Sequence, residues 1–235
     1  MWYMTDDAEE PHGFGTRCVH AGQTPDPATG AAAPPVYQTS SYVFEDADTA
    51  ADLYALEGEG NVYSRFSNPT VSTLERRLAD LEGGSGACAT ASGMAAIDAT
   101  TLVLADDGDN VVSSSSIYGS THSYLSHTAA RRGIEARFVD TLDYGAYADA
   151  IDDDTAYVHV ETIGNPSLVT PDFQELAAVC EAAEVPLVVD NTFATPAASP
   201  ARRNVRRVPC MPRDRERSEE NPVIRRSGRA WRFLP

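Results

Sequence analysis

The first regular pattern of hydrophobic and polar positions along the chain is a helical one, over residues 69–82. Asn68 before it is suited to an N-cap, Pro69 takes the first helical position, and Gly83 ends the pattern. Its apolar residues are spaced three or four positions apart: Val71, Leu74, Leu78 and Leu81. The pattern predicts an amphipathic helix between Pro69 and Gly83.

Beyond this helix, strand-like runs alternate with further helical segments. One helix is expected from Ser92 onward, and another between Pro171 and Glu184. The apolar face of the later helix consists of Phe173, Leu176, Ala177 and Cys180. The strand-like runs occupy residues 86–90, 111–115, 137–140, 156–160 and 187–189. This alternation gives right-handed βαβ units, so we expect an α/β fold with a mostly parallel sheet flanked by helices.

The run VPLVVDNTFATP, residues 185–196, is the element around which we expect the chain to be organised. The three apolar residues 187–189 follow Pro186 and predict a strand buried on both faces of a parallel sheet. Asp190 closes the run, and ligands of open α/β sheets lie at the carboxyl ends of strands. The alternative is a plain strand-end turn, with Asp190 and Asn191 acting as turn residues.

The two ends of the chain differ in character from its middle. The first sixty residues are rich in loops, and residues 25–35 predict an extended arm. After Pro196 both periods stop, and the composition predicts disorder. We therefore expect an N-terminal arm over 1–67, part of a ligand-binding domain over 68–196 and an Arg/Pro-rich tail over 197–235.

Charge is distributed very unevenly. Residues 1–200 carry 7 arginines against 31 acidic residues, whereas residues 201–235 carry 11 arginines against 4. The chain contains no lysine, and its net charge is −17. Such an acidic, lysine-free body is typical of halophilic proteins, where carboxylates keep the surface hydrated. The acidic N-terminus and the lack of a long apolar run predict no signal peptide and no membrane span, and hence a cytoplasmic protein. The four scattered cysteines predict no metal site.

Two segments could bind phosphate. Ser92, Gly93 and Met94 form a strand-to-helix turn, where free backbone N–H groups and a positive helix end favour an anion. The alternative is that small residues there only allow tight packing. Arg65, beside the hydroxyl of Tyr63, is a cation in an acidic chain, and its alternative role is a surface salt bridge.

Two further segments carry polar residues after strand-like runs. Tyr118 follows the run 111–115, where its ring could stack on a flat ligand, although burial in the core is the alternative. Glu161 and Asn165 follow the run 156–160 within ETIGNP, across a tight turn.

Taken in order, YSRFSNPT, ASGMAAI, IYGST, ETIGNP and VDNTFATP resemble the transsulfuration family of pyridoxal-phosphate (PLP) enzymes, over about Gly13 to Pro196. That family includes cystathionine γ-synthase, cystathionine γ-lyase, methionine γ-lyase and O-acetylhomoserine sulfhydrylase. The stretches FGTRCVHAGQTPDPATGA and ETIGNP look most like O-acetylhomoserine sulfhydrylases, whereas SGM leans towards cystathionine γ-synthase. The resemblance implies the PLP-dependent transferase-like fold (fold type I), here incomplete.

The resemblance also implies roles for individual residues. Asp190 would pair with the pyridine nitrogen of pyridoxal 5'-phosphate, with Thr192 as a lesser candidate in the same motif. Gly93 and Met94 would donate backbone N–H groups to the phosphate. Tyr118 would stack on the ring and assist proton transfer, and it is the catalytic candidate. The remaining implied cofactor-binding residues are Asn165 near the phenolic oxygen, its support Glu161, and Tyr63 and Arg65 across a homodimer or homotetramer interface.

One essential group of the family has no counterpart. The family attaches its cofactor to a lysine in an S-x-T-K motif, and this chain has no lysine. Arginine stays protonated and does not replace it. The resemblance therefore implies PLP-dependent γ-replacement on an O-acylhomoserine, an amino-acid substrate, in methionine or cysteine biosynthesis, but inactivity for this chain. We attribute the change after Pro196 to a frameshift or a replaced segment.

Two alternatives remain open at this stage. The first is an activity of the cystathionine γ-synthase or γ-lyase type. The second is a non-catalytic PLP-fold fragment whose Arg-rich tail binds nucleic acid or an acidic partner. The tail's lack of interleaved aromatic residues weighs against this second alternative, and nucleic acid is not expected as a partner.

Overall fold

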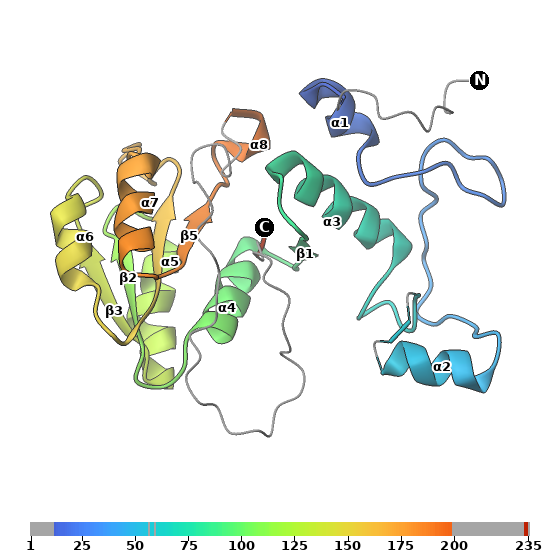
Figure 1. Cartoon of the computed structure of the whole chain (residues 1–235), viewed down its shortest axis with the longest axis horizontal. Coiled ribbons are helices and arrows are strands. Elements are labelled where there is room, and N and C mark those ends of the chain that lie inside the picture. The colour runs from blue at the N-terminus through green and yellow to red at the C-terminus, as the bar shows by residue number, and fades with distance from the viewer. Residues whose placement is uncertain (1–11, 56, 59, 199–232, 235) are drawn as a thin grey trace. The chain divides into compact units, whose positions relative to one another are not determined.

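The computed structural model describes residues 12–55, 57–58, 60–198 and 233–234, and the chain divides into two compact units, 1–81 and 82–235 (Figure 1). The predicted disorder of residues 197–235 falls almost entirely outside the described residues. The division predicted at residues 67 and 196 stays a prediction. No helix in the described part of the chain is long and apolar enough to cross a membrane.

The described residues of the first unit form three helices joined by irregular segments. They are α1 (Phe14–His20), α2 (Ala47–Tyr54) and α3 (Pro69–Glu82). Of these helices only α3 was predicted. Its N-cap is confirmed, because Asn68 Oδ1 accepts a hydrogen bond of 2.9 Å from the Thr70 N–H. Residues 25–35 contain no helix or strand, as predicted. The apolar stripe of α3 is incompletely covered, since Val71 and Leu74 are 41% and 49% exposed.

The second unit is an α/β layer structure. Its central sheet has the order β3-β2-β4-β5, and every strand pair is parallel. The strands are β2 (Asn110–Ser114), β3 (Glu135–Val139), β4 (Thr155–Glu161) and β5 (Leu187–Asp190). The helices are α4 (Gly93–Leu104), α5 (Gly119–Ser123), η1 (Tyr124–Ala129), η2 (Ala130–Arg132), α6 (Tyr144–Ala150), α7 (Phe173–Ala182) and α8 (Thr195–Ala198). The predicted α/β class and parallel sheet are confirmed.

Three strand predictions need correction. The strand expected over 86–90 is reduced to β1 (Cys88–Ala89), which pairs in parallel with β6 (Phe233–Leu234) apart from the main sheet. The strand expected at 137–140 begins at Glu135, because its backbone stays in register with Asn110 of β2. Strand β5 is not buried on both faces: it lies at the edge of the described sheet, so all four of its residues are only partly buried.

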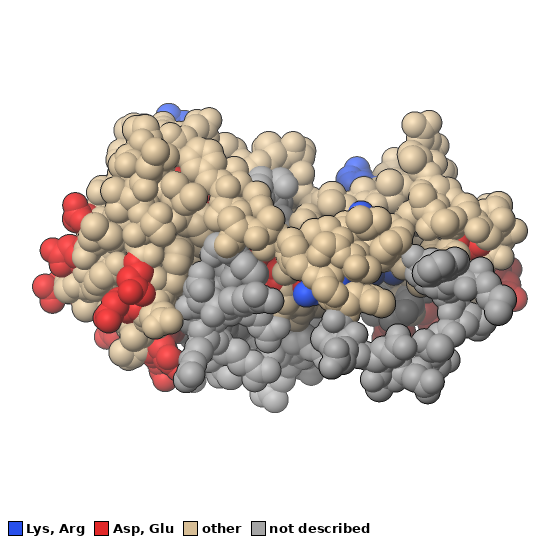
Figure 2. Space-filling model, turned by 90° about the horizontal axis from the view of Figure 1, so that it is seen from above, with Lys and Arg blue, Asp and Glu red and all other residues tan. Residues whose placement is uncertain are grey.

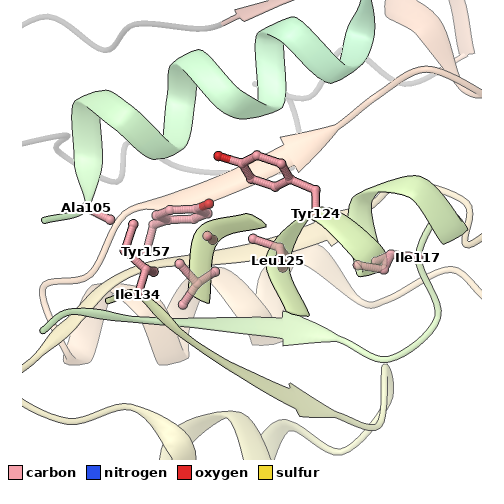
Figure 3. Packing of buried hydrophobic residues seen from close by; sticks show 8 residues of the cluster. Ala105, Ile117, Tyr124, Leu125, Ile134 and Tyr157 are labelled. Carbon is pink, nitrogen blue, oxygen red and sulfur yellow. The ribbon is translucent and has the colours of Figure 1, made fainter. Parts of the chain in front are cut away.

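Two hydrophobic clusters cover the opposite faces of the sheet. The first packs α4 and η1 against the strands, and Figure 3 shows Tyr124 and Tyr157 lying between α4 and the sheet. The second packs α6 and α7 against Val112, Val158 and Val160. The apolar face predicted for α7 is confirmed: Phe173, Leu176, Ala177 and Cys180 are buried. Alternate residues of each central strand thus point to different helices, as the period of two requires.

The surface of the second unit carries many carboxylates. Figure 2 shows acidic side chains gathered at the α6 end of this unit. Exposed members of this group are Asp140, Asp143, Asp149, Asp152, Asp153 and Asp154. Asp152 of this group forms an ion pair with Arg137, at a distance of 2.6 Å.

Candidate functional site

Glu161, the last residue of β4, joins two loops at the carboxyl edge of the sheet. Its Oε1 accepts a hydrogen bond of 2.6 Å from the Tyr118 N–H, and its Oε2 accepts one of 3.0 Å from the Asn165 N–H. The side chain is 7% exposed, and burial raises the pKa of the carboxyl, while the two N–H donors oppose that rise. One carboxylate therefore fixes the loop after β2 relative to the loop after β4.

The turn after Glu161 packs closely on the loop that follows β2. The Gly164 N–H donates to the Val169 carbonyl at 2.8 Å, and the Leu168 N–H donates to the Gly164 carbonyl at 2.7 Å. A Cβ on Gly164 would lie 2.7 Å from the Ser116 carbonyl oxygen. The glycine of ETIGNP is therefore required by close approach of two backbones, and it places Asn165 beside Glu161.

The Gly164→Ala variant should lose about 2 kcal/mol in free energy of unfolding, because overpacking forces a backbone shift. Urea unfolding followed by circular dichroism measures the loss. Gly119→Ala is the matched control, since a Cβ at Gly119 would meet nothing within 4 Å. Equal losses in the two variants would contradict the packing argument.

Asp190 ends β5 directly beside Glu161, its register partner on β4. Its Oδ1 accepts a hydrogen bond of 3.0 Å from the Thr192 N–H and one of 2.5 Å from the Thr192 hydroxyl. The carboxylate thus stabilises the turn after β5, which was the alternative role for this residue. It also lies at the strand end where a ligand was predicted. Among the described residues, no hydrogen bond reaches its Oδ2, which stays available.

The start of α4 offers a second set of free groups. Ser92 caps the helix, since its Oγ accepts a hydrogen bond of 3.1 Å from the Ala95 N–H. Within the described part of the chain, the N–H groups of Gly93 and Met94 donate to no other atom. Thr121 of α5 lies beside this turn, with its hydroxyl 3.8 Å from the Met94 sulfur. The first turn of α4 therefore faces the start of α5 with two open donors.

Tyr118 precedes α5 as its N-cap residue. Its backbone is held by Glu161, but its side chain is 46% exposed, so the alternative of a core tyrosine does not hold. An exposed ring on a fixed backbone suits stacking against a flat ligand.

The structure brings seven of the nine predicted residues into the second unit. They are Gly93, Met94, Tyr118, Glu161, Asn165, Asp190 and Thr192. Their chemistry fits pyridoxal phosphate: open N–H donors at a helix start suit a phosphate, and a carboxylate oxygen without a partner suits a pyridinium. Each of these groups follows the carboxyl end of a strand or opens a helix, where α/β folds bind ligands.

Tyr63 and Arg65 belong to the first unit. The Arg65 guanidinium lies 5.2 Å from the centre of the Tyr63 ring and 5.7 Å from that of Phe66. Among the described residues Arg65 forms no ion pair, so the alternative of a surface salt bridge is not observed.

Sequence reasoning missed one polar residue beneath this edge. His159 lies two positions before Glu161 on β4 and is 1% exposed. The available signal was its place in the run AYVHV, where strand alternation puts residues 159 and 161 on one face.

Comparison with known proteins adds a second line of support. A family model for Cys/Met metabolism PLP-dependent enzymes matches residues 15–202. The homocysteine synthase of Schizosaccharomyces pombe is 47% identical over 184 residues, which are 78% of this chain and 43% of that protein. The O-acetyl-L-homoserine sulfhydrylase of Leptospira meyeri is 45% identical over 181 residues, covering 77% of this chain and 41% of the relative.

A solved structure has a similar fold. It is assigned as an O-acetylhomoserine (thiol)-lyase from Campylobacter jejuni and carries an N'-pyridoxyl-lysine-5'-monophosphate. It matches with a TM-score of 0.79 and 36% identity, over 83% of this chain and 48% of that one. The chain thus spans under half the length of the relatives that it matches.

Proposed function

Because the chain belongs to the Cys/Met metabolism PLP-dependent enzyme family, we propose that residues 82–198 are the PLP-binding part of an O-acetylhomoserine sulfhydrylase. Relatives of the chain include O-acetylhomoserine sulfhydrylases and homocysteine synthases. The whole protein would replace the γ-acyloxy group of an O-acylhomoserine, which leaves as a carboxylate, by sulfide or a thiol. The observation that carries the proposal is the Glu161 carboxylate, which holds the Tyr118 and Asn165 backbones beside Asp190.

The described residues would divide the binding of PLP among them. Gly93 and Met94 would donate their open N–H groups to the phosphate. Asp190, steadied by Thr192, would face the pyridine nitrogen and keep it protonated. When bound, PLP supplies an electron sink for carbanions.

Two other groups would act on the rest of the cofactor. The exposed Tyr118 ring would cover one face of the pyridine and exclude water from it. The Asn165 amide would donate to the phenolic oxygen, with Glu161 fixing the backbone from which it extends.

Assembly into a homodimer or homotetramer is part of the proposal. Tyr63 and Arg65 would grip the phosphate bound to a second copy, where the planar guanidinium suits bidentate binding. An exposed apolar side chain beside this pair supports an interface: Phe66 is 75% exposed, and the centre of its ring lies 5.7 Å from the Arg65 guanidinium. We also propose that the protein works in a salt-rich cytoplasm. The acidic surface of the second unit supports the salt-rich setting (Figure 2).

We further propose that this chain binds PLP without a covalent bond and does not complete γ-replacement. None of its 235 residues is a lysine, so no side-chain amine is present to form a covalent bond with the cofactor. Its arginines stay protonated and do not take that role. Borohydride treatment followed by peptide mass spectrometry should find reduced PLP on no residue apart from the N-terminal amine. Attachment at an internal residue, or homocysteine formed from O-acetylhomoserine and sulfide, would contradict this part.

Replacing Asp190 by asparagine should weaken PLP binding about tenfold or more, because the hydrogen bond from the pyridinium would lose its charged acceptor. Equilibrium dialysis with PLP in concentrated salt measures the dissociation constant. Asp149→Asn is the matched control, since Asp149 is an exposed carboxylate on α6, which packs on the other sheet face. Failure of the unmodified chain to bind PLP would overturn the proposed function.

A further inference from the structure

His159 is a buried imidazole for which the proposed function so far has no use. Its Nδ1 lies 3.3 Å from the Ser113 hydroxyl on the neighbouring strand β2. Its Nε2 is buried and has no hydrogen-bond partner among the described residues. A buried polar atom without a partner costs free energy, so its retention calls for an explanation.

The pairing register places this imidazole on the same sheet face as Asp190. His159 pairs with Val188, and Glu161 pairs with Asp190. Val158 and Val160 pack in the cluster under α6 and α7, so the side chains of His159 and Glu161 point to the α4 face. Strand spacing and rise put His159 and Asp190 about 8 Å apart along the diagonal between their backbones.

Charge and protonation fit a donor at this place. Burial lowers the pKa of His159 from 6.5 to about 4, while the Asp190 charge opposes this shift. The imidazole is therefore neutral at pH 7, with one proton on one nitrogen. A proton on Nε2 would face the carboxylate favourably, whereas a lone pair there would face it unfavourably. The Ser113 hydroxyl can then donate to Nδ1 rather than to the Ser114 carbonyl, which lies 3.2 Å away.

We propose that His159 is a positioning residue: its Nε2–H donates a hydrogen bond to the Asp190 carboxylate and holds that carboxylate toward the pyridine nitrogen of the cofactor. This inference rests on the PLP-binding function proposed above. His159 Nε2 and Asp190 Oδ2 lie on the same face of the sheet, and neither has a hydrogen-bond partner among the described residues. Thr192 donates only to the other oxygen of Asp190, Oδ1. Glu161, the other carboxylate on this face, is engaged with Tyr118 and Asn165.

The first test uses the chain without cofactor. Nitrogen-15 NMR of labelled histidine distinguishes the five imidazoles, and the signal lost in His159→Gln is that of His159. We expect the Nε2–H tautomer at pH 7, and Asp190→Asn should shift this signal and lower the pKa of His159. The Nδ1–H tautomer, or a signal that Asp190→Asn leaves unchanged, would overturn the inference.

The second test compares two amide replacements that keep different parts of the imidazole. Glutamine places a donor near the position of Nε2, whereas asparagine places one near Nδ1 and leaves Asp190 without it. PLP affinity by equilibrium dialysis should fall about tenfold in His159→Asn and less than threefold in His159→Gln. Equal affinities in the two variants would overturn the inference.

The two tests also separate this inference from the proposed function. If the unmodified chain binds no PLP, the proposed function fails, and the NMR coupling still decides whether His159 acts on Asp190. If PLP binds but neither the tautomer nor the asparagine variant behaves as expected, the inference alone fails. Far-UV circular dichroism of both variants checks that each is folded.

Discussion

Replacement of Glu161 by alanine is expected to lower the free energy of unfolding by about 3 kcal/mol, because two charge-assisted hydrogen bonds disappear together. The Tyr118 and Asn165 N–H groups would lose the acceptors that they now reach at 2.6 and 3.0 Å. The loops after β2 and β4 would then no longer share an anchor. The loss of stability should therefore come with a loss of PLP binding.

Glu161→Gln is the informative companion to this variant. Glutamine keeps one acceptor oxygen but carries no charge. It therefore avoids the cost of burying a carboxylate, which is the cost that raises the pKa of Glu161. We expect it to lose about half as much stability as the alanine variant. Urea unfolding followed by circular dichroism gives both free energies by linear extrapolation. A loss below about 0.5 kcal/mol in Glu161→Ala would refute the role of this carboxylate as the anchor of two loops.

Local patterns predicted the elements that local chemistry determines. The cap by Asn68 and the buried face of α7 require only side chains a few residues apart, and both are present as predicted. Asp190 was identified from the strand that it ends, because the carboxyl end of a parallel strand is a ligand-binding place in any open α/β sheet.

Features that depend on distant partners were not predictable in this way. Strand β5 looked like a central strand by composition, but its burial depends on how many strands lie beyond it. The role of Glu161 depends on the N–H of Tyr118, which is 43 residues away in sequence. His159 escaped notice because a histidine in an apolar strand gives no local sign of the neighbouring Ser113 and Asp190.

Acid should destabilise the protein through His159. In the unfolded chain this imidazole binds a proton near its ordinary pKa of 6.5, whereas burial holds its pKa at about 4 in the folded state. Between these values the unfolded state binds more protons, so the stability that His159 contributes is present above pH 6.5 and is lost as pH falls to 4. The difference of 2.5 pKa units corresponds to about 3 kcal/mol.

The comparison of the unmodified chain with His159→Gln isolates this effect. Other groups titrate in both proteins: the raised pKa of Glu161 favours the folded state as pH falls, and the pKa of Asp152, at about 2, lies below the window. Their contributions cancel in the difference between the two unfolding free energies. Urea unfolding at several pH values should show that difference shifting by about 3 kcal/mol towards the variant between pH 7 and pH 4. A difference that stays constant would mean that folding leaves the pKa of His159 at its ordinary value, which would contradict an imidazole kept neutral by burial.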